Sequence, residues 1–371
     1  MSNTNTLVRG RGNWSNVIPS LSSTFALSAI SLSGFDLYFS GQNSRYQSGL
    51  GDNAFRPFFT KVSKPISVFG NQITKVSAGT YHTLLLTDNE LWVVGSGDEG
   101  QLGNGSVQET SWTKIPGSYK DIAAGINYSL ALSSNGRLWV CGGNQFGQLG
   151  LGDETTRNTW TLVVSCVSIT GTVSSRPFFD SVYQPTMFYS TYVLDGQGRL
   201  YVTGNNSQSE LGTNNTSDNV LEFTPITPLL TNGVYDLFLT KVCAGPSFAV
   251  GLSANGYIVA TGRNYFNQFG YGNVDYGPSN PDKIITDWGY LEGGFYTALS
   301  SIRAVDISCG FSHTWILSSN GRVLRAGTDT AGELVEGVYG VVRSEFTPLT
   351  GTPVSTWNKA IAGLGTTFLL S

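Results

Sequence analysis

The stretch IAAGINYSLALSSNGRLWVCGGNQFGQLGLGD, residues 122–153, contains the pattern from which most of this chain is built. Its residues Tyr128–Ser133 alternate large apolar and small side chains, which predicts a strand with the large side chains on one face. Asn135-Gly136 follows and predicts a two-residue hairpin turn, because Asn and Gly best tolerate the positive φ that both turn positions need. The return strand, Leu138–Cys141, leads into glycines around Gln148-Leu149. The stretch therefore predicts a β-hairpin followed by a glycine-rich loop.

Copies of this unit recur along the chain. Each copy begins with small residues, as in Ala124-Gly125, and we expect these to lie near a central axis where bulky side chains would not fit. A recurring unit of about this length, rich in short strands and glycine, is typical of a β-propeller. The glycine that ends the return strand recurs as Gly41, Gly95, Gly142, Gly204, Gly262 and Gly327.

The two ends of the chain predict how such a propeller closes. Residues 361–371 reproduce the first half of the unit and stop, and Leu7–Gly12 resembles the missing second half. With Gly10 included, seven second halves can be counted, and seven first halves match them. We therefore expect one all-β domain over residues 1–371. It would be a seven-bladed β-propeller closed by N- and C-terminal strands in one blade, which leaves no free edge strand.

Two further patterns recur in these copies. Gly79 with His82, and Gly310 with His313, form Gly-x-x-His strands, and Gly100–Gly103 and Gly147–Gly150 read Gly-Gln-Leu-Gly. These motifs resemble the hallmarks of the RCC1 (regulator of chromosome condensation) repeat family, and the resemblance covers nearly the whole chain. It implies a rigid disc that binds other proteins, since the family includes a nucleotide-exchange factor for a small GTPase and a secreted inhibitor of β-lactamases.

The amino-acid composition limits which classes of partner we expect. Only 12% of residues are charged, against about 25% in ordinary globular proteins. The net charge is −4 and there is no basic run, so we expect no nucleic-acid partner. The sequence lacks an apolar run long enough to predict a membrane span, and its N-terminus has no apolar signal region. Charge-poor, strand-rich chains are common among structural proteins of virions and the extracellular space, which predicts that location, with the cytoplasm as the alternative.

The residues that could carry chemistry do not assemble a predicted active site. Gly95–Gly100 matches G-x-G-x-x-G, but no helix can follow it, so we expect no dinucleotide cofactor. His82 and His313 occupy equivalent repeat positions, which favours packing in separate blades over a metal or catalytic pair. Paired carboxylates for glycoside hydrolysis stay open as an alternative, because propellers can bring distant loops together. We expect a protein that is not an enzyme.

Cysteines and loop aspartates have ordinary structural interpretations. The four cysteines show no metal-binding spacing, and we expect them to be buried small apolar residues without a disulfide framework. We expect the aspartates of the glycine loops to accept backbone N–H bonds in tight turns. The residues concerned are Cys141, Cys166, Cys243 and Cys309, and Asp52, Asp98 and Asp153.

The insertion at residues 272–307 is the richest in aromatic residues. Tyr and Trp in loops are favoured interface anchors, which predicts a partner contact here, although some of these side chains can instead cap outer strands. The candidate partner-binding residues are Tyr271, Tyr276, Trp288, Tyr290, Phe295 and Tyr296.

Together these features predict a non-enzymatic propeller that binds other proteins of a large assembly, without a cofactor, metal or membrane span. The composition favours a structural or receptor-binding component of a virion, such as a bacteriophage decoration, collar or tail protein. The alternatives are an RCC1-type guanine-nucleotide exchange factor and a secreted protein inhibitor of an enzyme such as a β-lactamase.

Overall fold

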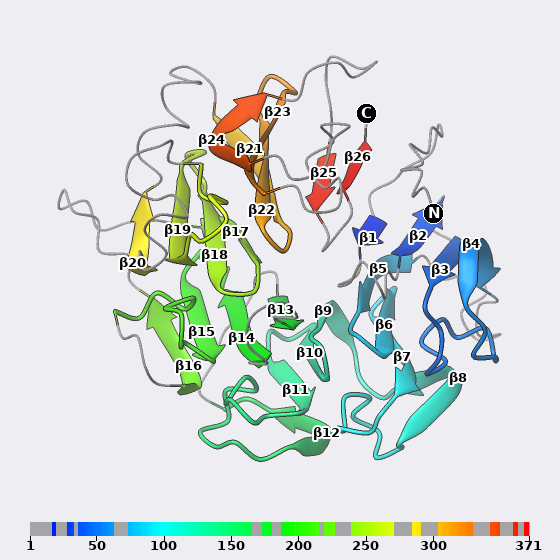
Figure 1. Ribbon diagram of the computed structural model, residues 1–371. Coiled ribbons are helices and arrows are strands. Elements are labelled where there is room, and N and C mark those ends of the chain that lie inside the picture. Colours follow the sequence, from blue (N-terminus) through cyan, green and yellow to red (C-terminus); the bar gives the residue numbers. More distant parts are fainter. Residues whose placement is uncertain are drawn as a thin grey trace.

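The strands of the protein form separate antiparallel sheets that follow one another in chain order around a common centre (Figure 1). The computed structural model describes residues 17–19, 28–32, 36–62, 73–164, 173–179, 187–196, 198–214, 219–226, 239–270, 284–290, 303–328, 342–348, 359–362 and 367–370. Within these residues every regular element is a strand, and there is no helix. It follows that the described part also has no helix long and apolar enough to cross a bilayer.

Six of the sheets have four strands each, and each strand pairs with its neighbour in the sequence. The first three contain β1 (Val17–Pro19), β2 (Ser28–Leu32), β3 (Asp36–Gly41) and β4 (Arg56–Val62); β5 (Ile73–Ala78), β6 (His82–Thr87), β7 (Glu90–Ser96) and β8 (Gln108–Ile115); and β9 (Tyr119–Ala124), β10 (Tyr128–Ser133), β11 (Leu138–Gly142) and β12 (Arg157–Leu162).

The next three sheets repeat this order, and a two-stranded sheet ends the chain. They contain β13 (Val173–Phe179), β14 (Met187–Leu194), β15 (Leu200–Gly204) and β16 (Val220–Ile226); β17 (Leu239–Ala244), β18 (Phe248–Ser253), β19 (Ile258–Arg263) and β20 (Ile284–Tyr290); β21 (Ala304–Cys309), β22 (His313–Ser318), β23 (Val323–Thr328) and β24 (Val342–Pro348); and finally β25 (Lys359–Ala362) with β26 (Thr367–Leu370).

The second strands β6, β10, β18 and β22 are buried along their whole length because neighbouring sheets pack face to face. All six residues of β10 are buried. Its large residues, Tyr128 and Leu130 among them, pack in one apolar cluster with Tyr189 of the following sheet. Its small residue Ala131 joins another cluster with Leu84 of the preceding sheet. The alternation in the sequence therefore separates two cores, one on each side of the sheet, rather than core from solvent.

The glycine that ends the third strand occupies a β-bulge. Gly142 has φ of 108°, and the register of β11 with β12 shifts just before it. A Cβ at this position would lie 2.4 Å from the Cα of Tyr128 and 2.5 Å from the carbonyl oxygen of Asn127, so only glycine fits. The six recurring glycines from Gly41 to Gly327 all have positive φ and are the last or the last but one residue of a third strand. The seventh, Gly10, lies outside the described residues.

The hairpin turns differ from the prediction in their backbone type. Gly136 has φ of 83°, but Asn135 does not take positive φ, so the two-residue turn predicted there is wrong. The chain instead uses a longer loop in which the Asn135 Oδ1 accepts from Ser133 Oγ (2.6 Å). A turn with positive φ at both central residues occurs at Asp88-Asn89, between the paired residues that end β6 and begin β7.

The reason for the glycine that follows the first strand also differs from the prediction. A Cβ on Gly125 would lie 2.1 Å from Cε1 of Tyr128, and one on Gly245 would lie 1.9 Å from Cε1 of Phe248. The glycine is therefore required by a ring three residues later, which lies directly over it. At Gly79 a Cβ would also lie 2.3 Å from the carbonyl oxygen of Gly125 in the next sheet, so crowding between inner strands, the cause inferred from the sequence, adds to the contact with the ring there.

The first and last sheets of the described chain lie next to each other. The two-stranded sheet contacts β21 and β22 on one side, and β25 contacts β1 on the other. In Figure 1, β25 and β26 lie between the sheet that ends with β24 and the first sheet. The segment Leu7–Gly12, which the sequence analysis assigns to the closing blade, lies outside the described residues.

Candidate functional site

We call the segments between the third and fourth strands of a sheet the glycine loops. In these loops the same buried side-chain amides bond to the loop backbone, and we call this bonded part the base of the loop. In the loop after β11, Asn144 Oδ1 accepts from the backbone N–H of Leu149 (2.9 Å). Gln148 Oε1 accepts from the backbone N–H of Phe146 (3.0 Å). The Gln bond recurs in the loops that contain Gln47, Gln101 and Gln268. The polar residues of the repeat therefore hold the loop backbone, and all of these amides are buried.

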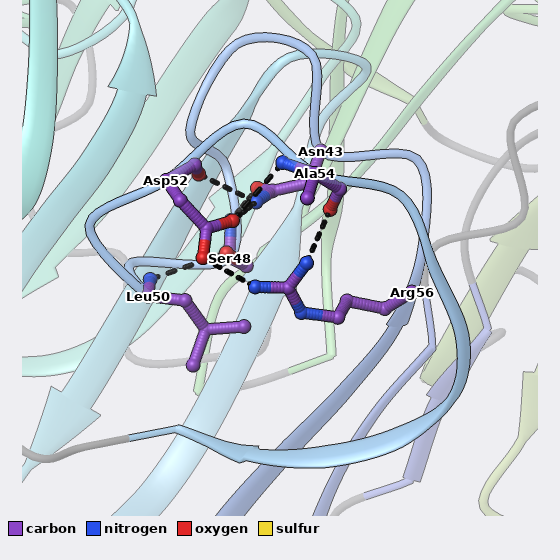
Figure 2. Close-up of polar contacts among 6 residues, drawn as sticks. All are labelled: Asn43, Ser48, Leu50, Asp52, Ala54 and Arg56. Atoms are coloured by element: carbon purple, nitrogen blue, oxygen red, sulfur yellow. Dashed lines mark hydrogen bonds and ion pairs between the residues drawn. The ribbon is translucent and has the colours of Figure 1, made fainter.

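In two of these loops an aspartate bonds to the residues that lead into the fourth strand. Figure 2 shows the loop that contains Asp52. Asp52 Oδ1 accepts from the backbone N–H of Ala54 (3.0 Å), and its Oδ2 accepts from Arg56 (2.5 Å). Asn43 Nδ2 donates to the Asp52 carbonyl oxygen (2.6 Å). The N–H bond from Ala54 and the Arg56 guanidinium hold the pKa of the Asp52 carboxyl below its usual value. The turn-acceptor role predicted for this aspartate is confirmed.

The other two loop aspartates differ from each other in their contacts. Asp153 repeats the arrangement of Asp52, accepting from the backbone N–H of Thr155 (2.8 Å) and from Arg157 (2.6 Å), and these bonds lower its pKa. Asp98 does not: its carboxylate pairs with Arg45 at 3.2 Å, across to the preceding loop. The prediction for Asp98 is therefore wrong, because Asp98 lies at the start of its loop, whereas the position of Asp52 and Asp153 is occupied there by Ser106.

Each loop also locks onto the following sheet. Gly150 has φ of 66°, and a Cβ there would lie 2.3 Å from Cδ2 of Phe223 on β16. Thr191 Oγ1 of that sheet donates to the carbonyl oxygen of Gln148 (2.7 Å). The same glycine-to-aromatic contact joins Gly49 to Trp112, Gly103 to Trp160, Gly212 to Trp288 and Gly270 to Phe346.

Trp288 therefore packs between two sheets and does not lie at the surface. Only 1% of its surface is exposed, and its indole N–H donates to the carbonyl oxygen of Leu211 (3.0 Å). Its ring lies edge-on to Tyr192, with centroids 6.4 Å apart. The prediction that Trp288 is a partner contact is corrected, because the fourth strand carries this residue beneath the preceding loop. Tyr290 ends β20, and the remaining candidates, Tyr271, Tyr276, Phe295 and Tyr296, lie outside the described residues.

Glu210 stands where four other loops have glutamine. Its Oε2 accepts from the backbone N–H of Gln208 (2.8 Å), as the glutamine oxygen does elsewhere. The residue is 1% exposed, and burial raises the pKa of its carboxyl to about 8. A protonated carboxyl resembles a primary amide in shape and in having one donor side and one acceptor side. Glu210 therefore replaces glutamine in its neutral form.

The histidine–serine pair of His82 and Ser129 is inaccessible. His82 Nε2 lies 2.9 Å from Ser129 Oγ, which itself donates to the carbonyl oxygen of Gln101 (2.7 Å). Both side chains are fully buried, and burial lowers the pKa of His82 to about 3. His313 is equally buried in another sheet. The two histidines thus lie inside separate sheets, and the described residues contain no group of three potential metal ligands.

Two cysteines depart from the prediction. Cys243 on β17 and Cys309 on β21 form a disulfide between neighbouring sheets, with Cα atoms 5.5 Å apart. The expectation of buried apolar cysteines without a disulfide is wrong for this pair, because the ends of the first strands of adjacent sheets come within bonding reach, even though the two positions differ by one residue in the repeat. Cys141 is free and buried, and burial raises the pKa of its thiol. Cys166 lies outside the described residues.

The tips of the loops, unlike their bases, differ from one sheet to the next. The tip after β19 carries Tyr265 and Phe266, whose rings are 4.9 Å apart and nearly perpendicular. Phe266 also lies 5.6 Å from Phe311 of the following sheet, and the Arg263 guanidinium stacks over Tyr265 at 5.2 Å. Tyr265 is 41% exposed. We call Tyr265, Phe266 and Phe311 the tip cluster.

The sequence analysis missed the tip cluster. Its members flank the aromatic insertion, since Phe266 precedes it and Phe311 follows it. The available signal was a departure from the repeat: the corresponding tip after β15 has Ser207-Gln208. One exposed ring, Tyr265, and two half-buried rings anchored across two sheets form a surface suited to a protein contact, because such rings lose little conformational freedom when they are covered.

Comparisons with known proteins agree with this architecture. A family model described as "Regulator of chromosome condensation (RCC1) repeat" matches residues 73–101, 119–148 and 239–268. The ultraviolet-B receptor UVR8 of Arabidopsis thaliana is 25% identical over 82% of this chain and 64% of its own length. The secretion-regulating guanine nucleotide exchange factor of Bos taurus is 30% identical over 38% of this chain and 26% of its own. The chain thus spans less than two thirds of these relatives.

One solved structure has the same fold. Prp20p from Saccharomyces cerevisiae, described together with its binding to Gsp1p and histones, superposes with a TM-score of 0.74. The match covers 96% of this chain and 83% of that chain at 15% identity. It supports the β-propeller architecture expected from the glycine repeats.

Proposed function

This chain belongs to the RCC1-repeat family, and we propose that it is a non-enzymatic propeller that binds a protein partner through the tips of its glycine loops. The observation that carries the proposal is the tip cluster, where Tyr265, Phe266 and Phe311 join two sheets at the surface. The loop bases beneath are fixed by buried hydrogen bonds, so the rings are presented on a rigid support. Rigid aromatic anchors of this kind dominate the energetics of protein interfaces.

We further propose a seventh blade, made of β25 and β26 and completed by the N-terminal segment. The contacts of β25 with β1 and of the two-stranded sheet with β21 and β22 support it. The resemblance of Leu7–Gly12 to a third strand supports it as well. In this arrangement the two sheet ends that are free in a linear array are paired, which stabilises the whole ring.

For the partner, the relatives favour a guanine-nucleotide-binding protein. Prp20p is described with its binding to Gsp1p, and the bovine relative is named as a guanine nucleotide exchange factor. The virion role expected from composition gains no support from these relatives. We therefore propose nucleotide exchange as the activity to be tested first, with the tip cluster as the contact surface.

The test uses the full chain and Gsp1p loaded with a fluorescent GDP analogue. We expect the chain to accelerate release of the analogue at least about tenfold. The double variant Phe266→Ala, Phe311→Ala should lose most of that acceleration. Tyr257→Ala is the matched control, since Tyr257 is 38% exposed in the same sheet but precedes β19, at the end opposite the loop tip.

Each outcome decides part of the proposal. Binding without acceleration would overturn exchange and leave the protein-binding role. Acceleration that survives the double variant would overturn the tip cluster as the contact surface. If neither Gsp1p nor other small GTPases bind, the assignment of partner class is wrong.

A further inference from the structure

A groove opens at the outer rim between the sheet of β5–β8 and the sheet of β9–β12. It encloses about 570 Å³, within the roughly 300–1,000 Å³ typical of ligand-binding clefts. Figure 1 shows β8 and β12 as neighbouring strands at this rim, and the sheet of the tip cluster lies elsewhere in the ring. The groove is therefore a different surface from the one proposed above, and the inference below does not depend on that proposal.

One end of the groove is formed by a short connection between two sheets. Only Pro116–Ser118 joins β8 to β9, whereas the other connections between successive sheets are ten to thirteen residues long by the strand bounds. The short connection is pinned from both sides, since the Tyr119 hydroxyl donates to the Pro116 carbonyl oxygen (2.8 Å) and Ser118 Oγ lies 2.7 Å from Ser134 Oγ. It lines one end of the groove and is fixed there.

Two tryptophans line the groove. Trp139 of β11 and Trp160 of β12 are half-buried and pack against the apolar cluster between the two sheets. The equivalent of Trp139 in the preceding sheet, Trp92, is 4% exposed and lies under Lys114. At this junction, then, indole surface that is covered in the neighbouring sheet is left open to solvent.

The charged and polar side chains that line the groove offer mainly hydrogen-bond donors. Its described lining contains Lys114 and Arg137 and no aspartate or glutamate. Lys114 is paired with Glu90 (2.5 Å), and among the described residues no ion pair occupies Arg137, which is exposed. Asn135 Oδ1 is already used by Ser133 Oγ and the Arg137 N–H, so its remaining polar group is the donor Nδ2. The chain as a whole is acidic, with net charge −4, but this groove is not.

We propose that this groove binds an extended segment of a partner protein that carries an acidic residue next to an aromatic one. The carboxylate pairs with the Arg137 guanidinium, which is built for bidentate contact with a carboxylate. The aromatic side chain packs on Trp139 and Trp160, where it covers the open indole surface. The lining supplies attraction at both points and contains no carboxylate of its own. The carboxylates bonded to it, Glu90 and Glu109, are engaged by Lys114 (2.5 Å) and Asn104 (2.7 Å).

The experiment selects binders from a phage library of random eight-residue peptides on the immobilised full-length protein. Enriched peptides are then labelled, and their affinities are measured by fluorescence polarisation. We expect the enriched sequences to share an acidic residue beside an aromatic one, and to bind Arg137→Glu at least about tenfold more weakly. Lys120→Glu is the matched control, because it makes the same charge change at an exposed residue outside the groove lining.

Reversing the charge on the peptide as well as on the protein distinguishes loss of the ion pair from misfolding of the variant. Replacing the peptide's acidic residue by lysine should restore binding to Arg137→Glu and weaken binding to the unmodified protein. Three results would overturn the proposal: no enrichment, enriched peptides without an acidic residue, or equal affinity for the Arg137→Glu and Lys120→Glu variants.

Discussion

The glycine loops after β11 and β19 have the same base and different tips. In both bases an asparagine accepts from the residue five positions on, and a glutamine accepts from the residue two positions back. At the tips, Phe146 stacks on Tyr189 of the following sheet, with centroids 5.1 Å apart, and its equivalent Phe266 lies against Phe311. The tips differ at the preceding residue, where the loop after β11 has Gln145 and the loop after β19 has the exposed Tyr265.

The difference shows how one repeat serves two purposes. Residues of the base are buried, hydrogen-bonded and repeated from sheet to sheet. A change there should weaken the packing between sheets and lower the free energy of unfolding. Tip residues vary and carry few buried contacts, so a change there should alter what the surface binds. Four variants test this division, from the largest expected effect on stability to the smallest.

Replacing Trp288 by alanine should have the largest effect. The ring is fully enclosed beneath the preceding loop and its N–H is bonded, so its loss removes packing and leaves a cavity. We expect a loss of about 3–5 kcal/mol in the free energy of unfolding, measured by denaturant titration. If unfolding were unchanged while partner binding fell, Trp288 would be a contact residue after all.

Glu210→Gln should stabilise the protein near neutral pH. The folded carboxyl has its pKa raised from 4.5 to about 8, so the unfolded state loses its proton first as pH rises. Stability is therefore full below about pH 4.5 and falls by up to about 1.4 kcal/mol per pH unit until about pH 8. The glutamine variant should lack this slope and be more stable at pH 7, by roughly 3 kcal/mol at most.

Unfolding curves collected from pH 4 to pH 9 check this second prediction. The wild-type and Glu210→Gln curves should converge at the acidic end and separate toward the alkaline end. Parallel curves would mean that Glu210 titrates near its ordinary pKa and that its burial is relieved by some other contact.

Gly150→Ala should destabilise by about 2–3 kcal/mol. Alanine at φ of 66° is strained, and its Cβ meets the ring of Phe223. The control is Gly152→Ala, where φ is also positive but the nearest atoms belong to the mobile end of Glu222, at 3.0 Å. Equal losses at the two positions would show that backbone strain, and not the lock onto the next sheet, sets the cost.

Asp98→Asn should have the smallest effect. Its ion pair with Arg45 joins two loop tips, and both side chains are about half exposed, at 52% and 49%. Exposed pairs contribute about 0–1 kcal/mol, so we expect a change below about 0.5 kcal/mol that shrinks further in high salt. A loss comparable to that of Gly150→Ala would place tip contacts among the stabilising ones.

The sequence predicted the strands and the spacing of the repeat, because alternation and glycine position are local properties. β10 and β11 lie where Tyr128–Ser133 and Leu138–Cys141 were expected. It could not predict contacts between repeats. The ring over Gly125, the disulfide between Cys243 and Cys309, and the burial of Trp288 all depend on which positions of adjacent sheets face each other.

The site was predicted less well for a related reason. Aromatic content pointed to the insertion at residues 272–307, but composition does not distinguish a ring that locks two sheets, as Trp288 does, from one that faces solvent. The useful signal was comparison between copies. Tyr265-Phe266 stands where another copy has Ser207-Gln208, and a departure from a repeat whose base is unchanged marks a position free of the structural constraint.

The most direct measurement transplants one tip onto another base. The double variant Tyr265→Ser, Phe266→Gln gives the loop after β19 the tip of the loop after β15, and its melting temperature and partner binding are measured together. We predict a melting temperature within about 2 °C of the wild type and binding weakened at least about tenfold. A drop in melting temperature like that of Gly150→Ala, or unchanged binding, would contradict the division between base and tip.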